Sequence, residues 1–237
     1  MDDVRSDEYM SEIIKKHLQG VSLFKELSEE EIQPIVEISR MRMYKAKSFV
    51  FMQGDTLDRV FFIHSGKVKI QKTDTSGKEQ IVSILQDGEM FPHSGFFRKG
   101  SFPAHAEILE DAQLIVIPIV DFEMILIKYP ELCIKLFRVL GEKIVDLQNR
   151  LEEQILHDTY ARIIMLLLRL CKSNGVQIDE KYKITTHFTN RELANMIGTS
   201  RETMSRTITY LRKNELIATD GDGHFLIDLN KLENEII

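Results

Sequence analysis

The sequence contains little cysteine and no long apolar run, and both absences limit what the chain can be. Only Cys133 and Cys171 occur among 237 residues, too few for a disulfide framework, so we expect a reducing cytoplasm. The longest apolar run, at 114–120, has seven residues, whereas a membrane-spanning helix needs about 20. The acidic N-terminus lacks the apolar segment of a signal peptide. We therefore expect a cytoplasmic protein without a membrane partner.

Motifs of common enzymes are also missing. The chain has no Gly-rich phosphate loop followed by Lys-Ser/Thr, no nucleophile elbow and no plausible catalytic triad. His64, His93 and His105 recur in one region, but metal sites need three or more convergent ligands, and no H-x-H or H-x-x-E spacing occurs. Partly exposed or hydrogen-bonded histidines are the simpler interpretation. We expect no enzyme activity, no metal and no cofactor.

A helix-turn-helix is predicted for residues 189–213. Thr189 and Glu192 have the spacing of a capping box, in which each side chain bonds the other residue's backbone N–H. Gly198 stands where a left-handed residue ends a helix, and Ser200 is a suitable N-cap for the next helix. Two short helices joined by such a turn are typical of a DNA-binding helix-turn-helix.

The second of these helices has one apolar and one polar side. Met204, Ile208 and Leu211 fall at i, i+4 and i+7 and form one apolar stripe. The opposite side, with Arg201 at its edge, carries residue types that bind base edges or phosphates: Glu202, Ser205, Arg206, Thr209 and Lys213. A polar face is also the ordinary form of a solvated surface helix, so the helix alone leaves both interpretations open.

The segment C-terminal to this helix favours DNA binding. Residues 215–219 and 224–228 have the pattern of two short strands around an Asp-Gly-Asp-Gly turn, which would form the wing of a winged helix-turn-helix. The net charge of −6 argues against nucleic acid, but the acidic excess lies before residue 158. Residues 187–213 hold five basic and two acidic side chains, a local charge of +3. Because phosphate attraction acts over about 10 Å, the local charge matters more than the total.

The N-terminal half changes from helical to strand periodicity. Residues 1–20 look helical, and Ser28 with Glu31 forms a second capping box. After about Arg42, short β-prone runs alternate with turns. The glycines of these turns are spaced 12, 11, 11 and 12 residues apart: Gly54, Gly66, Gly77, Gly88 and Gly100. This rhythm is typical of a small antiparallel barrel or roll whose corners need a positive φ.

A helical period returns at about Val120. From Phe137 onward, apolar residues repeat alternately three and four positions apart, the heptad spacing of a coiled coil. The predicted dimer interface consists of Leu140, Ile144, Leu147 and Leu151. Core packing explains Phe137 equally well, but the charged flanks around Leu147 leave only a narrow seam, suited to a second copy of the chain. We expect an N-terminal domain at 1–125, a dimerisation helix at 126–157 and a DNA-binding domain at 158–237.

A β-roll, a long helix and a winged helix in this order resemble the Crp/Fnr superfamily of bacterial transcription regulators. The stretches with the strongest similarity are FMQGDTLDRVFFIHSGKVKI at 51–70 and LANMIGTSRETMSRTITYLRKNELI at 193–217. The resemblance implies an α+β fold with a double-stranded β-roll of the cyclic-nucleotide-binding type, a dimerisation helix and a C-terminal winged helix-turn-helix. It also implies a homodimer that binds double-stranded DNA; an activator would in addition contact RNA polymerase.

The resemblance assigns roles to the second helix. Arg201, Glu202 and Arg206 match the R-E-x-x-x-R pattern with which the cyclic-AMP receptor type binds TGTGA, and Ser205 completes the E-x-x-S-R of the Fnr type, which binds TTGAT. Arginine can bind guanine bidentately and a carboxylate can accept from cytosine. The implied operator is an inverted repeat of TGA-containing half-sites about one helical turn apart. The full expected set is Thr189, Ser200, Arg201, Glu202, Ser205, Arg206, Thr209 and Lys213.

The sequence departs from the family where other members bind their effectors. The Gly-Glu pair for ribose and the Arg-Ser/Thr pair for phosphate align with Pro92-His93 and Pro103-Ala104, so we expect no control by cyclic AMP. Two distant cysteines cannot supply the four thiolates of an iron–sulfur cluster. An unidentified small-molecule effector remains compatible with the roll, with His93, Ser94, Ala104 and His105 as candidates for its pocket. The alternative function is a regulatory subunit or sensor whose primary role is ligand binding.

Overall fold

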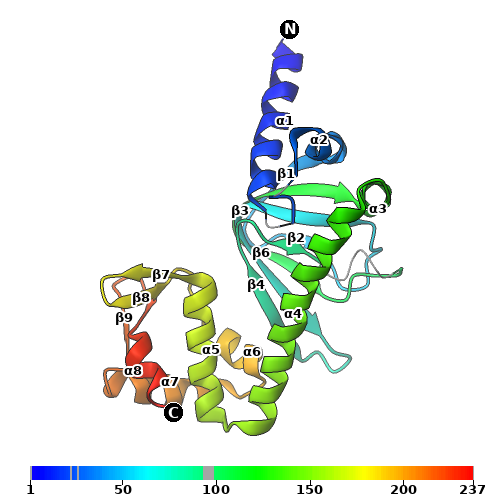
Figure 1. Cartoon of the computed structure of the whole chain (residues 1–237). Coiled ribbons are helices and arrows are strands. Elements are labelled where there is room, and N and C mark those ends of the chain that lie inside the picture. The colour runs from blue at the N-terminus through cyan, green and yellow to red at the C-terminus, as the bar shows by residue number, and fades with distance from the viewer. Residues whose placement is uncertain (1, 22, 26, 93–98, 237) are drawn as a thin grey trace. The chain divides into compact units, whose positions relative to one another are not determined.

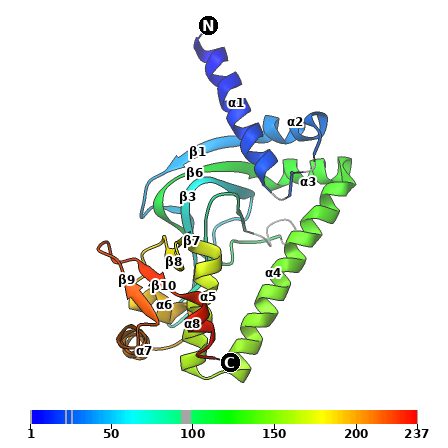
Figure 2. The same ribbon diagram turned by 60° about the vertical axis from the view of Figure 1, so that its left-hand side comes forward.

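Antiparallel strands between Arg40 and Pro118 form the predicted β-roll (Figure 1). The computed structural model describes residues 2–21, 23–25, 27–92 and 99–236. The strands of the roll are β1 (Arg40–Tyr44), β2 (Phe49–Phe51), β3 (Arg59–Thr73), β4 (Glu79–Leu85), β5 (Met90–Phe91) and β6 (His105–Pro118). They pair in the order β1-β6-β3-β4, with β2 on β6 and β5 on β3. Figure 2 shows β1, β6 and β3 side by side along the curved sheet.

The long strands β3 and β6 are buried on both faces over part of their length. Side chains alternate between the two faces of a strand. Val60 and Phe62 of β3 therefore pack toward the helices, whereas Phe61 and Ile63 pack inside the roll. Residues 114–117 of β6 repeat this alternation. The continuous apolar runs of these strands thus serve two hydrophobic clusters, one on each face of the sheet.

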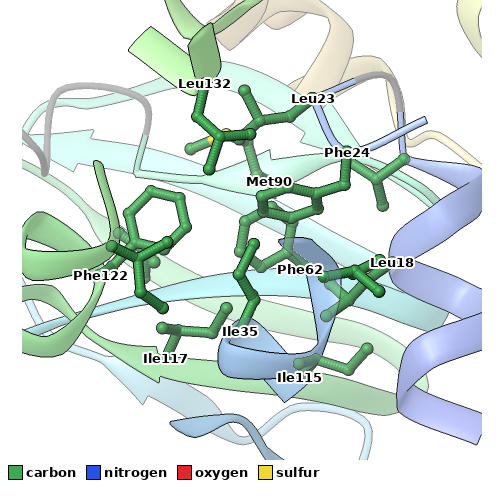
Figure 3. Packing of buried hydrophobic residues seen from close by; sticks show 14 of the residues in the cluster. Leu18, Leu23, Phe24, Ile35, Phe62, Met90, Ile115, Ile117, Phe122 and Leu132 are labelled. Atoms are coloured by element: carbon green, nitrogen blue, oxygen red, sulfur yellow. The ribbon is translucent and has the colours of Figure 1, made fainter. Parts of the chain in front are cut away.

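Helices cover one of these faces. They are α1 (Asp2–Gly20), α2 (Glu29–Ile38), α3 (Ile119–Lys128) and the first turns of α4 (Pro130–Leu156). The capping box predicted at the start of α2 is confirmed, since Ser28 Oγ accepts from the Glu31 amide at 3.3 Å and the Glu31 carboxylate accepts from the Ser28 amide at 2.8 Å. Figure 3 shows Phe24, Phe62 and Phe122 meeting in this core, with ring centroids of the first two 5.2 Å apart.

The glycine rhythm of the roll is confirmed. All five corner glycines have a positive φ: Gly54, Gly66, Gly77, Gly88 and Gly100. Gly66 is also confined sterically, because a Cβ on it would lie 2.7 Å from the Asp111 carbonyl oxygen and 2.7 Å from the Ala112 Cβ. These atoms belong to β6, which pairs with β3 around Gly66, so the close approach of the two strands depends on the missing side chain.

Gly66→Ala should therefore be far more damaging than alanine at another corner. We expect it to lower the free energy of unfolding by roughly 2–5 kcal/mol, from the positive φ together with the overpacking. Gly77→Ala, which has a positive φ but open space around it, should cost about 1–2 kcal/mol. Gly141→Ala, in α4 with open space, should be neutral or stabilising. Urea denaturation of the three variants tests this order; equal losses for the two corner variants would contradict it.

The C-terminal unit is a smaller α+β domain. Its elements are α5 (Thr159–Asn174), β7 (Gly175–Ile178), β8 (Lys181–Ile184), α6 (Asn190–Ile197), α7 (Arg201–Lys213), β9 (Ile217–Thr219), β10 (Phe225–Ile227) and α8 (Leu229–Glu233). The strands form one sheet in the order β7-β8-β10-β9. Asp158 caps α5 by accepting from the Ala161 amide at 2.9 Å. In the described parts of the chain, no helix is both long and apolar enough to cross a membrane.

The boundary between the two units lies within α4. The compact units are Met1–Val145 and Asp146–Ile237; the division into a domain at 1–125, a dimerisation helix at 126–157 and a DNA-binding domain at 158–237 stays a prediction. The last turns of α4 are tied to the C-terminal unit by side chains that the sequence pattern does not reveal. Glu153 accepts from Arg169 Nη1 at 3.0 Å, and Gln154 accepts from Arg162 and donates to the carbonyl of Ile197 at 3.4 Å.

Candidate nucleic-acid interface

The predicted helix-turn-helix is present, and local hydrogen bonds fix its turn. Thr189 and Glu192 form the predicted capping box at the start of α6. Gly198 ends the helix in the left-handed conformation, with φ 70° and ψ 39°. Ser200 Oγ then accepts from the Thr203 amide at 3.1 Å and starts α7. The turn geometry therefore follows from residues that the sequence identified.

Packing sets the rotation of α7 about its own axis. Met204, Ile208 and Leu211 are buried. The expected DNA-contacting side chains on the opposite side are exposed, except for Ser205, which is half-buried: Arg201, Glu202, Ser205, Arg206, Thr209 and Lys213. Because the apolar stripe is fixed in the core, the helix presents Glu202 and Arg206 one turn apart on its outer surface.

The outer side chains of α7 differ in what they already bind. Thr209 Oγ1 donates to the Ser205 carbonyl at 2.8 Å, so this hydroxyl proton is already used within the helix. Arg206 Nη2 lies 3.5 Å from Thr203 Oγ1, a long contact that leaves most of the guanidinium donors available. The Glu202 carboxylate makes no hydrogen bond or ion pair with any part of the chain that the structure describes. The Glu202 carboxylate and most of the Arg206 donors are thus available to bind another molecule.

The two hydroxyls expected at phosphates have capping roles in the free protein. Thr189 Oγ1 donates to the Glu192 carboxylate at 2.9 Å while accepting its amide. Ser200 Oγ lies 3.0 Å from Thr203 Oγ1 in addition to accepting the Thr203 amide. Both hydroxyls therefore stabilise helix starts, and a contact of either with a phosphate would be additional to these bonds.

The wing is shorter than the sequence pattern indicated. Its strands span 217–219 and 225–227 rather than 215–219 and 224–228. Glu215 has a φ of 58°, which is outside the β region, so the chain turns sharply after α7 before β9 begins. The hairpin loop is organised by Asp220. Its Oδ1 accepts from the amides of Asp222 at 3.0 Å and His224 at 2.9 Å.

Asp220 also connects the wing to β8, because its Oδ2 lies 2.6 Å from Lys183 Nζ. The hydrogen bond from Lys183, with those of the His224 and Asp222 amides, holds the pKa of the Asp220 carboxyl well below its ordinary value of 3.8. Asp220, Asp222 and His224 offer ligand atoms within 4.8 Å of one another. Since the Asp220 carboxylate already accepts from an ammonium group and two amides, a structural role accounts for this cluster.

Asp220→Asn should make the wing less stable in a pH-dependent way. A carboxyl group whose folded pKa is depressed contributes stability above its unfolded pKa and loses it as the pH falls through the folded value. The difference in urea midpoint between the wild type and Asp220→Asn should therefore be largest near pH 5 and shrink toward about pH 3. Asp222→Asn, whose exposed side chain makes no hydrogen bond to the described chain, is the matched control. A difference that does not change with pH would contradict the assignment.

The β7–β8 hairpin and its link to the wing are features that sequence reasoning missed. Lys183 lies in β8, which pairs with β10 and so brings its ammonium group to Asp220. The two-residue turn uses Asp179, with a φ of 52°, followed by Glu180. Neither Asn-Gly nor Asp-Gly occurs there, and these are the pairs that usually indicate such a turn. The two strands are short, and β8 has Lys at alternate positions, so neither shows the apolar pattern by which a strand is predicted.

The candidates for an effector pocket do not form a described site. His93 and Ser94 lie outside the described residues. Ala104 is buried in the roll. His105 is partly buried, and its Nδ1 accepts from the Gln53 amide at 3.1 Å, so it supports the loop after β2. His64, considered with it as a metal ligand, instead meets the ring of His17 edge-on, with centroids 4.6 Å apart.

The expected dimer seam on α4 is largely exposed. Ile144, Leu147 and Leu151 are 56%, 57% and 62% exposed, and Phe137 is 60% exposed. Leu140 differs, because it is half-buried and packs against the helical core of its own chain. Core packing therefore accounts for Leu140, which the heptad pattern assigned to the dimer interface, whereas Phe137, for which both interpretations were open, is exposed. Packing within the core of this chain therefore does not explain the exposed apolar side chains of α4.

Comparison with known proteins gives the same two-part organisation. Residues 41–129 match the cyclic nucleotide-binding domain family, and residues 161–235 match the Crp-like helix-turn-helix domain. The chain is 29% identical over 206 residues to the transcriptional activator protein Anr of Pseudomonas protegens, a match that covers 85% of this chain and 83% of Anr. It is 27% identical over 183 residues to the CRP-like cAMP-activated global transcriptional regulator of Mycobacterium tuberculosis, covering 77% and 82%.

A solved structure supports the fold independently. The c-di-GMP-responsive global regulator CLP of Xanthomonas campestris has a TM-score of 0.72 with this chain at 19% identity, over 84% of this chain and 99% of CLP. A β-roll of the cyclic nucleotide-binding kind followed by a winged helix-turn-helix defines a DNA-binding transcription regulator. The chain belongs to the Crp/Fnr family of these regulators. Anr and the relative from Mycobacterium tuberculosis are both transcription regulators.

Proposed function

We propose that the protein acts as a homodimer that binds an inverted-repeat operator with TGA-containing half-sites. The observation that carries this proposal is the outer surface of α7, where Glu202 and Arg206 are exposed one turn apart while the apolar stripe is fixed in the core. An α-helix of this kind fits the major groove, in which each base pair presents a distinct pattern of donors and acceptors. Arg201 lies at the start of the same surface, next to the helix N-terminus.

The chemistry of these side chains fits a T-G-A core. The Arg206 guanidinium can donate to guanine O6 and N7, and the Glu202 carboxylate can accept from the cytosine amino group of the opposite strand. Arg201, at the positive end of the helix dipole, suits either a base or a phosphate. Arg201 belongs to the R-E-x-x-x-R pattern of the TGTGA type and Ser205 to the E-x-x-S-R pattern of the TTGAT type, so the proposal is limited to the TGA that both half-sites share.

Arg206→Ala tests the role of the guanidinium. On a duplex with an inverted repeat of TGTGA or TTGAT, the variant should lose about 1–3 kcal/mol, roughly 5- to 150-fold, and should tolerate changes at one base pair of the half-site. Fluorescence anisotropy with single-base-pair variants of the duplex measures both effects. Arg212→Ala is the matched control, because it removes the same charge from the same helix, where the guanidinium lies over the Phe225 ring at 5.7 Å.

The two variants separate base recognition from simple attraction to phosphates. Arg212→Ala should weaken binding to the operator and to random DNA alike, and only slightly. If Arg206→Ala gave the same uniform loss, the proposed contact with a base would be wrong.

Dimerisation is the second part of the proposal. The apolar positions of α4 continue in heptad spacing through Ile144, Leu147 and Leu151, and all three are exposed to solvent in the single chain. Two copies of such a seam would bury these residues against each other. Pairing also explains an inverted repeat, since a two-fold protein dimer presents two equivalent recognition helices to DNA.

Leu147→Glu should therefore give monomers. A carboxylate at the centre of the seam would be buried without a partner, which is unfavourable enough to prevent pairing. Loss of the second half-site contact should weaken operator binding by roughly 100-fold or more. Sedimentation velocity and anisotropy measure these effects. Gln148→Glu, which adds the same charge at the next exposed position of α4, should remain dimeric; an unchanged sedimentation coefficient for Leu147→Glu would contradict the seam.

We further propose that the regulator is not controlled by cyclic AMP bound in the usual manner. The positions that align with the phosphate-binding Arg-Ser/Thr pair hold Pro103 and Ala104, and Ala104 is buried in the roll. Neither supplies a cation for the cyclic phosphate. The relative from Mycobacterium tuberculosis is described as cAMP-activated, so this proposal implies that effector response differs within the family even where the fold is shared.

A further inference from the structure

A hollow beside the recognition helix contains residues that the proposed base contacts do not use. It has a volume of about 430 Å³ and is lined by Tyr160, Arg206, Thr207, Tyr210 and Glu235. These side chains come from three elements of the C-terminal unit: the start of α5, the middle of α7 and the segment after α8. Arg206 therefore lies between the outer surface of α7 and this hollow.

Tyr160 forms the fixed wall of the hollow. Its hydroxyl donates to the Glu235 carboxylate at 2.8 Å. Burial of the ring, together with this hydrogen bond, raises the pKa of Tyr160 above its ordinary value, so the phenol stays protonated and remains a donor to Glu235. The hydroxyl of Tyr160 is consequently committed within the protein.

Tyr210 forms the exposed wall. It lies one helical turn after Arg206, is 52% exposed, and its ring meets that of Tyr160 edge-on with centroids 5.9 Å apart. Such a contact orients the ring. The Tyr210 hydroxyl has no hydrogen-bond partner within the described chain. A phenol oriented by its contact with Tyr160 thus presents an available donor next to Arg206.

We infer that this hollow is a second DNA contact, in which the Tyr210 hydroxyl donates to a backbone phosphate beside the base pair bound by Arg206. The inference rests on the proposed function of α7. A phosphate oxygen is the ligand that suits a neutral, oriented donor at the rim of a groove-facing helix, and such contacts fix the register of a protein on the duplex without selecting sequence. The nearby Arg206 charge attracts the same group.

Glu235 limits this contact and gives the inference a second test. Its carboxylate lines the same hollow and repels a phosphate. The site therefore combines attraction by the Arg206 cation with repulsion by the Glu235 anion. Glu235→Gln removes the charge but keeps a carbonyl oxygen that can accept from Tyr160. Binding to any duplex should therefore become tighter by a few fold when this carboxylate is neutralised.

The experiment measures anisotropy of the full-length protein on the inverted-repeat duplex and on a random duplex over a salt series. Tyr210→Phe keeps the ring and its contact with Tyr160, and should weaken binding to both duplexes by roughly five- to tenfold. The slope of log affinity against log salt should not change, because a neutral donor releases no counterion. Lys213→Ala, the charged comparison on the same helix, should reduce that slope by about one.

The outcomes separate this inference from the proposed function. Wild-type affinity of Tyr210→Phe on both duplexes would overturn the inference, and a loss confined to the inverted repeat would show a base contact and overturn the phosphate assignment. Weaker binding of Glu235→Gln would also contradict it. If Arg206→Ala kept full preference for the inverted repeat, the proposed function itself would fail, whatever Tyr210→Phe did.

Discussion

Burial of three apolar side chains on α7 decides which surface this helix offers to DNA. Met204, Ile208 and Leu211 are almost completely inaccessible to solvent, and they fix the rotation of the helix. Because an α-helix has 3.6 residues per turn, burying one face also determines which side chains point outward. Glu202 and Arg206 become exposed because their neighbours are buried. The residue at which α7 begins is fixed separately, by the capped turn around Gly198.

Much of this arrangement could be predicted from local sequence because its determinants are local. A capping box, a left-handed glycine and an N-cap each act within a few residues, so Thr189, Gly198 and Ser200 could be assigned from the sequence. The glycines of the roll are similar. Their spacing predicts a corner every eleven or twelve residues. The backbone at each of these glycines has a positive φ, as such a corner requires.

Contacts between distant residues could not be predicted in the same way. Lys183 and Asp220 meet only because β8 pairs with β10, and a lysine in a short polar strand gives no sign of this. Tyr160 and Tyr210 lie on different helices. Glu153 and Gln154 near the end of α4 bond to Arg169 and to the Ile197 carbonyl, contacts that apolar periodicity does not indicate. The residue types on the outer face of α7 could be read from the sequence. The residues of other elements that lie next to α7 could not.

If two copies of α7 select DNA sequence through their outer side chains, the purified protein should select its operator from a pool of duplexes, either alone or with cell extract that supplies a small-molecule effector. Selection of bound duplexes from a random pool measures this preference. We expect enrichment of an inverted repeat whose half-sites contain TGA and lie about one helical turn apart. Recovery of sequences no different from the unselected pool, or of a single unrepeated motif, would contradict recognition by a pair of such helices.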